Sequence, residues 1–285
     1  MFEVRNCLVC NNNKSTFIFN KLLIKCNICG FVTANLNIES IEAKSIYSEK
    51  YFKGEEYEDY LRDKIFIQSN FYKRIQQIKK SINSEFLTNI LEIGCAYGFF
   101  GELAIKEWQC NYLGVDIAYN AIEYARHKLN LNAICEDYLS KENTGIKYDT
   151  VFMWDVIEHL PNPHSYLKKI GSEIRDGGYV VITTGDIGSL LAKIQGRKWR
   201  MIHPPSHLHY FDKMTIKKLL NNSGFDIQSV YYPAILRSLK QIFFSLFLLN
   251  KESNFFLTKI YNSIPKSLCF SLNFYDIMFI IAKKK

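Results

Sequence analysis

Four cysteines near the N-terminus have the spacing of metal ligands. Cys7 and Cys10 form one C-x2-C pair, and Cys26 and Cys29 form a second pair after fifteen intervening residues. Each pair can place two thiolates on one side of a tight turn, and two such turns complete a tetrahedral site of four sulfurs. We predict a structural zinc site in a ribbon over residues 1–40, with a redox site or a chance pairing as the alternatives.

Three histidines lie within seven residues of one another, beside two prolines. They are His203, His207 and His209, in the segment Trp199–Phe211. A neutral imidazole needs little change of its pKa to take a proton near pH 7, so this segment can supply a general base. The alternative is a histidine that pins a loop through a backbone hydrogen bond.

A glycine-rich segment, Leu91–Gly101, has the composition of a nucleotide-cofactor loop. It follows a short apolar run and precedes a helix-like segment, and this order of strand, turn and helix lets backbone approach a ligand closely. Ala96 stands where the second glycine of a dinucleotide-binding loop would be, and Glu92 lies two residues before Gly94. The segment therefore predicts a cofactor loop that is not of the dinucleotide type.

Apolar segments that alternate with amphipathic ones predict the scaffold that positions these groups. After the strand before the glycine loop, the predicted strands lie within residues 111–116, 132–138, 148–160, 177–183, 224–230 and 275–283. This alternation favours a parallel sheet covered on both faces, with ligands at the carboxyl ends of the strands. Asp116 ends the second strand, where its carboxylate can accept both hydroxyls of a ribose.

In this order, the segments resemble class I S-adenosylmethionine-dependent methyltransferases. The loop with Glu92 and Gly94 resembles their first motif, and Asp155–His159 resembles the D-V-x-E-H block of their small-molecule branch. The resemblance implies an α/β fold with a Rossmann-like seven-stranded sheet, an antiparallel last strand and S-adenosylmethionine as the cofactor. The residues that it assigns to the cofactor are Glu92, Gly94, Ala96, Gly98, Asp116, Ile117, Asp137, Tyr138, Asp155 and Tyr51.

The resemblance also assigns the acceptor side of the site. The segment from His203 to Phe211 resembles the active-site loop of sugar and small-metabolite methyltransferases, where the pattern is often Glu-His-x-x-Tyr-Phe. His207 matches the family histidine and is the predicted general base, with His203 as the second choice. His159 is a third candidate that either reacts or holds the loop. Ser206 replaces the acid of the pattern, which removes one base or orienting carboxylate.

The predicted function is methyl transfer to a saccharide or other small molecule. Chains that join a zinc ribbon to this domain resemble enzymes of surface-polysaccharide and deoxysugar biosynthesis, which favours O-methylation. One alternative is an RNA base methyltransferase, but Asp155–Glu158 departs from the Asn/Asp-Pro-Pro-aromatic block of one large group, and the basic residues are scattered. The other is a non-catalytic binding protein, which the intact set of Glu92, Gly94, Asp116 and Asp137 disfavours. We expect a small-molecule or glycan acceptor and no nucleic acid.

The composition is that of a globular protein with a basic surface. Of 285 residues, 48% are hydrophobic and 22% are charged, and the formal net charge is +8, which favours anionic partners. The sequence shows neither an apolar signal core nor a run long enough to span a membrane. We therefore expect a cytoplasmic protein that can associate peripherally with the inner face of the membrane. The predicted domains are the ribbon (1–40), a helical lid or linker (41–85) and the methyltransferase domain (86–285).

A helical insertion over residues 236–273 separates the last two predicted strands. It holds five cations (Arg237, Lys240, Lys251, Lys259 and Lys266) and one anion (Glu252), so its net charge is +4. Its core, Ile242–Leu249, is apolar nearly all round a helix. Such a segment must bury itself on its own domain, on a second copy or at a lipid surface. The remaining four cysteines lie in or beside apolar runs, and most of them are predicted to be buried packing residues: Cys95, Cys110, Cys135 and Cys269.

Overall fold

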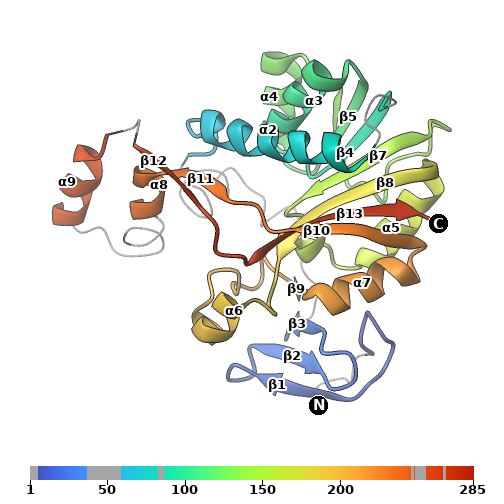
Figure 1. The fold of residues 1–285 in the computed structure, drawn as a ribbon, viewed down its shortest axis with the longest axis horizontal. Coiled ribbons are helices and arrows are strands. Elements are labelled where there is room, and N and C mark those ends of the chain that lie inside the picture. The colour runs from blue at the N-terminus through green and yellow to red at the C-terminus, as the bar shows by residue number, and fades with distance from the viewer. Residues whose placement is uncertain (1–5, 37–58, 83–86, 245–246, 248–254, 266–267) are drawn as a thin grey trace.

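The computed structural model describes residues 6–36, 59–82, 87–244, 247, 255–265 and 268–285. Figure 1 shows three parts: a ribbon at the N-terminus, a central sheet with helices, and a lobe that projects to the left. We call residues 6–36 the N-terminal ribbon. We call the described residues between 235 and 275 the C-terminal lobe.

The central sheet has seven strands in the order β10-β13-β8-β7-β4-β5-β6. Its strands are β4 (Asn89–Ile93), β5 (Asn111–Asp116), β6 (Ala133–Cys135), β7 (Tyr148–Trp154), β8 (Ile174–Gly185), β10 (Phe225–Tyr231) and β13 (Ile277–Lys284). Only β13 runs antiparallel to its neighbours, β8 and β10. This arrangement confirms the predicted fold class.

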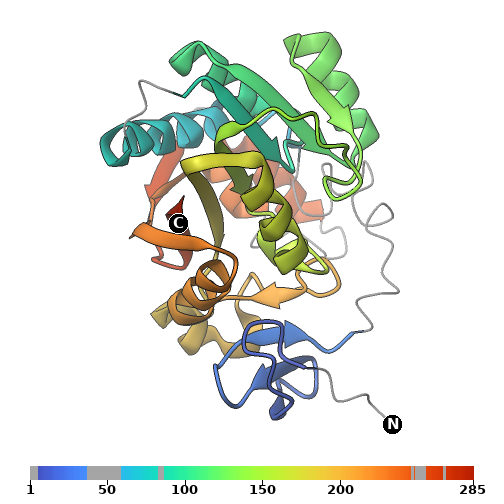
Figure 2. The ribbon, with the colours of Figure 1, turned by 90° about the vertical axis from the view of Figure 1, so that its right-hand side faces the viewer.

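Helices cover both faces of the sheet (Figure 2). One face packs on α2 (Lys64–Ser81), α3 (Phe99–Trp108) and α4 (Tyr119–Leu129), and the other on α5 (Pro163–Glu173) and α7 (Lys213–Asn222). Strand β7 shows why the strands are apolar throughout. Val151 and Met153 point to the α5 side, whereas Phe152 and Trp154 point to the α2 side.

The third predicted strand is shorter than expected. The prediction covered residues 132–138, but β6 ends at Cys135 and the chain turns at Asp137, whose carbonyl accepts a hydrogen bond from the Ser140 amide at 2.9 Å. The residues that follow Cys135 are acidic. Acidic side chains are unfavourable in strands and Asp is favoured in turns, so the strand ends here and the chain turns.

The N-terminal ribbon is part of a second sheet, which a strand from the second half of the chain completes. Strands β1 (Ser15–Ile18), β2 (Leu23–Cys26) and β3 (Val32–Ala34) form an antiparallel meander, and β3 pairs with β9 (His209–Tyr210). The hairpin of β1 and β2 lies between the two cysteine pairs. The sheet therefore joins residues far apart in the sequence.

The C-terminal lobe contains two helices and a two-stranded sheet. The elements are β11 (Ile235–Ser238), α8 (Leu239–Phe243), α9 (Phe255–Ser263) and β12 (Cys269–Leu272). The apolar run Ile242–Leu249 lies partly outside the described residues. Among the described residues, no helix is long and apolar enough to cross a membrane.

The four remaining cysteines, most of which were expected to be buried, differ in their exposure. Cys95 and Cys110 are buried and Cys135 is half-buried, but Cys269 is exposed. The reason is that all four residues of β12 are exposed, since this short strand pairs with β11 away from the central core. An apolar neighbourhood in the sequence does not ensure burial where the element lacks a second layer.

Candidate active site

The glycine loop turns sharply between β4 and α3. Gly94 and Gly98 have φ angles of +73° and +76°, which favour glycine. A Cβ at Gly94 would lie 2.4 Å from Cγ2 of Val156, and one at Gly98 would lie 2.4 Å from Cδ1 of Leu131. The loop therefore packs too closely for any side chain at these two positions. The N-terminus of α3, with its unpaired backbone amides, follows directly.

Asp116 ties this loop to the end of β5. Its Oδ2 accepts a hydrogen bond from the Ala96 amide at 2.8 Å, and its Oδ1 accepts one from the Ala118 amide at 2.8 Å. Burial raises the pKa of Asp116, while these amides and that of Ile117 oppose the rise. Each carboxylate oxygen keeps a further lone pair, so the group can still accept the hydroxyls of a ribose.

Glu92 lies beneath the loop rather than at its surface. The side chain is 2% exposed, and its carboxylate accepts a hydrogen bond from the hydroxyl of Tyr112. Burial raises its pKa well above the usual value. Glu92 is thus placed to support the loop from the sheet.

The third acid, Asp137, sits at the turn after β6. Its Oδ1 accepts hydrogen bonds from the Leu139 amide at 2.9 Å and from the Tyr166 hydroxyl at 2.6 Å. The Tyr138 side chain is 1% exposed and its hydroxyl donates to Glu173 at 3.2 Å, so only its backbone can meet a cofactor. Tyr51 lies outside the described residues.

Asp155 follows β7 with a φ of +54°, an uncommon conformation for a residue other than glycine. Its amide donates to the carbonyl oxygen of Thr183 at 3.1 Å and contacts the Thr183 Oγ1 at 2.9 Å, which holds the turn. Its Oδ1 is buried and has no hydrogen-bond partner among the described residues. Strain and an unsatisfied oxygen together are typical of a functional position.

Three histidines converge after this turn. The ring centroids of His203 and His207 are 3.9 Å apart, and those of His159 and His207 are 4.5 Å apart. Burial lowers the pKa of His159 to about 4 and that of His207 well below its usual value. Both imidazoles are therefore neutral near pH 7 and have nitrogen lone pairs to offer. His159 also holds the loop, because its Nδ1 lies 2.8 Å from the carbonyl oxygen of Ser206.

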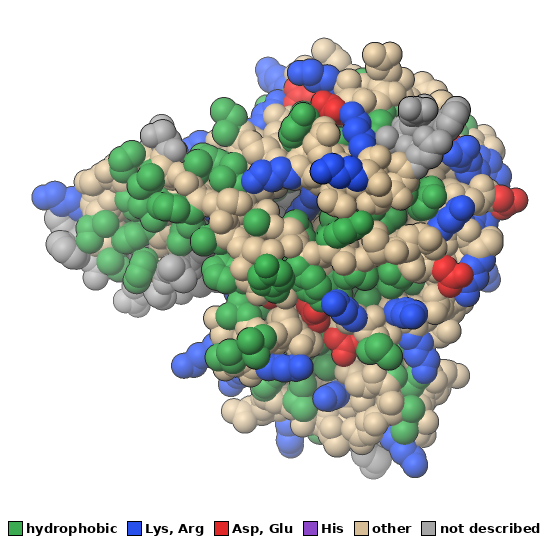
Figure 3. All heavy atoms as spheres, viewed as in Figure 1, with side chains coloured by type: hydrophobic (Ala, Val, Ile, Leu, Met, Phe, Trp, Pro, Cys, Tyr) green, Lys and Arg blue, Asp and Glu red, His purple; other side chains and the backbone are tan. Residues whose placement is uncertain are grey.

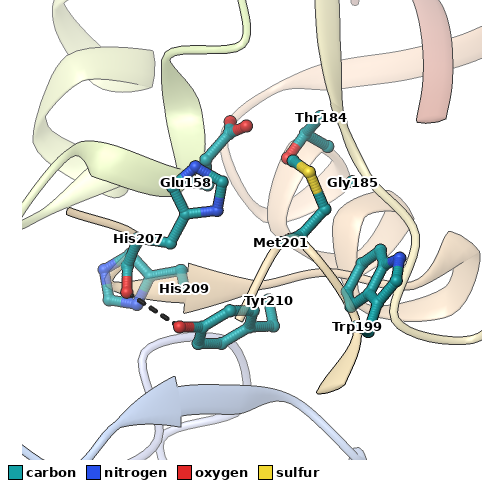
Figure 4. Close-up of a pocket in the computed structure, with 8 residues that line it drawn as sticks. All are labelled: Glu158, Thr184, Gly185, Trp199, Met201, His207, His209 and Tyr210. Atoms are coloured by element: carbon teal, nitrogen blue, oxygen red, sulfur yellow. Dashed lines mark hydrogen bonds between the residues drawn. The ribbon is translucent and has the colours of Figure 1, made fainter. Parts of the chain in front are cut away.

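Glu158 is a further member of this cluster, although it was not among the site residues predicted from the sequence. Figure 4 shows Glu158 and His207 approaching each other from different segments, with the Tyr210 hydroxyl bonded to the His207 carbonyl oxygen. Glu158 is 2% exposed, and neither carboxylate oxygen has a hydrogen-bond partner within the described part of the chain. Burial, with the nearby charge of Asp155, raises its pKa to about 8. Its position in the D-V-I-E-H block is the sequence signal that could have identified Glu158 as a site residue.

This cluster also has the donor atoms of a metal site. One ligand atom each from Glu158, His159 and His207 lie within 4.8 Å of one another. Two imidazoles and a carboxylate could hold a divalent cation. The same atoms can equally serve proton transfer.

The loop that carries His207 is held from both sides through Leu208. The Leu208 amide donates to the carbonyl oxygen of Glu158 at 2.9 Å, and its carbonyl oxygen accepts from the Ala34 amide at 2.8 Å. The Thr33 hydroxyl donates to the same carbonyl at 3.0 Å and lies 3.1 Å from Nδ1 of His209. His209 therefore faces the N-terminal ribbon and not the histidine cluster. No local pattern signals these contacts, because Thr33 and Leu208 are 175 residues apart.

The four N-terminal cysteines do come together. Their sulfurs lie within 4.8 Å of one another, with Cys7 to Cys29 and Cys10 to Cys26 at 3.5 Å. A tetrahedral zinc with Zn–S bonds of about 2.3 Å would separate the sulfurs by roughly 3.8 Å, so the arrangement fits such an ion.

The two cysteine turns also have the same backbone form. Asn11 and Gly30 follow the second cysteine of each pair with φ angles of +57° and +79°. Their amides donate to the carbonyl oxygens of Cys7 and Cys26 at 2.8 and 3.0 Å. Two equivalent turns that present four sulfurs to one point are what a closed metal site requires.

A glycine loop and an acid at the end of the next strand, on a sheet with one antiparallel strand, define the class I methyltransferase fold. Residues 57–230 match the family described as "Methyltransferase domain", which is more than half of the chain. The chain belongs to this family.

Two curated relatives are ubiquinone biosynthesis O-methyltransferases. That of Vibrio parahaemolyticus is 27% identical over 150 residues, which cover 49% of this chain and 63% of the relative. That of Leptothrix cholodnii is 24% identical over 150 residues with the same coverage. The chain thus spans less than two thirds of the length of these relatives.

Solved structures share the fold. A S-adenosylmethionine-dependent methyltransferase from Archaeoglobus fulgidus is 23% identical, with a TM-score of 0.51 over 79% of this chain and 99% of its own. Magnesium protoporphyrin IX methyltransferase from Synechocystis PCC 6803, solved with bound SAH, is 15% identical, with a TM-score of 0.51 over 78% and 84% of the two chains. At these identities the similarity concerns the fold.

Proposed function

We propose that this chain transfers a methyl group from S-adenosylmethionine to a hydroxyl oxygen of a saccharide or other small molecule. The observation that carries the proposal is the contact between Gly94 and Val156. The Val156 side chain fills the space where a Cβ of Gly94 would lie, so the turn that bears Asp155 and His159 packs directly on the cofactor loop. The cofactor loop and the histidine cluster therefore share one site.

S-adenosylmethionine supplies an electrophilic methyl group when bound. In the proposed reaction the acceptor oxygen would form a bond to that carbon as the carbon–sulfur bond breaks, and the acceptor would lose its proton. His207 is our candidate to take this proton, because burial keeps its ring neutral and the ring lies against that of His203. His159 keeps the loop in position through Ser206.

An oxygen acceptor agrees with the names of the relatives, which are O-methyltransferases. The choice of a saccharide, in surface-polysaccharide or deoxysugar biosynthesis, rests on the resemblance of the segment from His203 to Phe211. We further propose that the four cysteines hold one structural zinc, with no open position for substrate.

Two variants test the assignment of cofactor and base. Asp116→Ala should weaken S-adenosylmethionine binding by about 1.5–3 kcal/mol in calorimetry, because donors of the ribose lose their acceptor. Asp176→Ala, at a side chain that is 97% exposed, is the control. His207→Ala should lower turnover by about a hundredfold without a matching loss of cofactor affinity, with His127→Ala, 72% exposed, as its control.

The acceptor class needs a separate experiment. Methyl transfer from labelled S-adenosylmethionine into cell extract should survive ribonuclease treatment and appear in a fraction of small molecules or glycans. Label that disappears with ribonuclease would contradict the small-molecule proposal. Failure to bind S-adenosylmethionine at all would contradict the proposal that this chain transfers a methyl group from it.

A further inference from the structure

The turn after β6 places a carboxylate close to the acid that can accept the ribose. Cys135, the last residue of β6, pairs with Asp116, and β4, β5 and β6 run parallel to one another. Asp137 follows two residues later, so it lies at the same edge of the sheet as the glycine loop. This position suits a contact with the nucleobase of a cofactor whose ribose binds Asp116.

The two oxygens of the Asp137 carboxylate are not equivalent. Oδ1 accepts hydrogen bonds from the Leu139 amide at 2.9 Å and from the Tyr166 hydroxyl at 2.6 Å. Both of the hydrogen bonds that this carboxylate accepts from described residues are on Oδ1. Oδ2 is therefore the oxygen that remains for a donor on a ligand.

Tyr166 acts only as a donor towards this carboxylate. Its side chain is 7% exposed, and its ring packs beside that of Tyr138 with the centroids 6.0 Å apart. Burial, together with the hydrogen bond to Asp137, raises the pKa of Tyr166 above its usual value. The hydroxyl therefore keeps its proton near pH 7 and holds Oδ1 in place.

One face of α5 holds the rest of the turn. Tyr166, Lys169 and Glu173 are spaced by three and four residues, which places them on one side of the helix. Lys169 donates to the carbonyl oxygens of Leu139 and Lys141. The ammonium of Lys141 lies 3.5 Å from Oε2 of Glu173. The turn is thus fixed to the helix at several points.

The ion pair beneath the turn is buried. Lys141 and Glu173 are 5% and 1% exposed, and the Tyr138 hydroxyl donates to the same Glu173 oxygen at 3.2 Å. Figure 3 shows Lys and Arg side chains at the surface, where water solvates their charges. Removing two charges from water costs free energy that their attraction often does not recover. A buried pair is therefore a weak source of stability, and what it provides here is a fixed position for the turn.

These contacts give the carboxylate one orientation, and that orientation can select the base. Adenine presents an amino group that can donate to Oδ2, whereas a base with an oxygen at this position presents lone pairs. We propose that Tyr166 sets the preference of the cofactor site for a 6-amino purine, because it holds Asp137 with Oδ2 towards the ligand. Tyr166 is a positioning residue, since it acts through Asp137. The inference rests on the proposed function, which supplies the cofactor.

Binding calorimetry with the full chain tests the proposal through two ligands. They are S-adenosylhomocysteine and S-inosylhomocysteine, which differ in that an oxygen replaces the 6-amino group. The wild type should bind the adenosine compound about a hundredfold or more tightly, because the oxygen would face Oδ2 with lone pairs on both sides. Tyr166→Phe should lower this ratio by about tenfold, since the carboxylate can then turn towards the N1–H of the inosine compound.

Tyr148→Phe is the matched control for this variant. It removes a buried hydroxyl of the same core that has no hydrogen-bond partner within the described residues. The ratio of the two affinities should remain that of the wild type. An unchanged ratio in Tyr166→Phe, or an equal decrease in both variants, would overturn the proposal.

Asp137→Asn is a second test that does not require Tyr166→Phe to fold. The Leu139 amide can only donate, so it should keep the new amide oxygen at the place of Oδ1 and the amide nitrogen at that of Oδ2. The preference should then shift towards S-inosylhomocysteine by about a hundredfold, because the nitrogen can donate to its 6-oxygen. Adding Tyr166→Phe should reduce this shift by about tenfold, since one of the two donors that fix the amide is lost.

The outcomes separate this inference from the proposed function. Equal affinity of the wild type for the two ligands would leave cofactor binding intact and overturn the inference. An unchanged preference in Asp137→Asn would do the same, because the base would then not meet this carboxylate. Failure of the wild type to bind either ligand would contradict the proposed function and, with it, the inference.

Discussion

The two additions to the methyltransferase sheet, the N-terminal ribbon and the C-terminal lobe, differ in how they meet it. The ribbon shares a sheet with the domain, because β3 pairs with β9 and Thr33 contacts the backbone of Leu208. Its side chains Leu23 and Val32 are buried together with Trp199 and Tyr210 of the domain. The lobe instead leaves large apolar side chains exposed, among them Phe270 at 44% exposure.

This difference separates two ways in which an added segment can act. The ribbon can change the geometry of the site, since it holds the loop with His207 from one side while Glu158 holds it from the other. The candidate catalytic residues, in contrast, all lie outside the lobe. We therefore expect damage to the ribbon to lower turnover, and damage to the lobe to leave the fold and the site intact.

The largest expected effect comes from Cys26→Ser. Loss of one ligand should release the proposed zinc and unfold the ribbon, because such sites couple binding to folding. The loop should then shift, and turnover should fall by about a hundredfold, since small misplacements of catalytic groups cost that much. Elemental analysis should find one zinc per chain in the wild type, and Asp116 should still support cofactor binding in the variant.

Cys269→Ser is the matched control for this change, because Cys269 is an exposed cysteine of the lobe. It should keep the wild-type zinc content and turnover. Full turnover in Cys26→Ser would show that the ribbon does not position the loop.

Acid should weaken the junction between the ribbon and the domain. Burial lowers the pKa of His209 from 6.5 to about 4. Between these values the unfolded chain binds the proton and the folded chain does not, so stability is complete above about pH 6.5 and is lost as the pH falls towards 4. This group should contribute about 3 kcal/mol to the loss.

Urea unfolding of the wild type and of His209→Gln across this range measures the contribution. The variant should show a smaller decrease in stability between pH 6.5 and 4 than the wild type. Identical pH profiles would mean that His209 does not remain neutral at the junction.

A smaller effect is expected at Thr33. Thr33→Val removes the hydroxyl that contacts Leu208 and His209 but keeps the shape of the side chain. A buried acceptor or donor left without its partner costs about 1–3 kcal/mol, so turnover should fall by about tenfold as the loop loosens. The expected split is a lower kcat with little change in KM for S-adenosylmethionine.

Thr33→Ser should restore turnover, because it restores the hydroxyl. Thr16→Val, at an exposed position of the same ribbon, should have no effect. Wild-type turnover in Thr33→Val would mean that the Thr33 hydroxyl does not position the loop. The pairing of β3 with β9 would then be the contact that holds it.

The smallest effect is expected in the lobe. Leu272→Ala should change the free energy of unfolding by about 0.5 kcal/mol or less, since the side chain is 38% exposed and surface substitutions have small effects. Leu23→Ala in the ribbon is the same chemical change at 0% exposure and should cost about 2–5 kcal/mol. Similar losses in both variants would contradict the contrast between the two regions.

Much of the fold could be predicted because its signals are local. The strands, the glycine loop and the acid Asp116 each lie within short windows in which apolar runs, glycines and polar ends follow one another. The third strand was drawn too long because Asp137 lies in a turn beyond the sheet edge. The apolar neighbours of Cys269 did not reveal that this cysteine is exposed, because exposure depends on how β12 packs in the tertiary structure.

The candidate site divides in the same way. The sequence by itself determined the cofactor loop, the D-V-I-E-H block, the cysteine pairs and the histidine-rich segment, since each is a pattern of neighbouring residues. Only the tertiary structure decided that His159 and His207 meet with Glu158, that β9 completes the sheet of the ribbon, and that β12 is exposed. These contacts join residues as far apart as Val32 and Tyr210, which are 178 positions apart (210 − 32), and their free energy depends on the packing of the whole chain rather than on any local pattern.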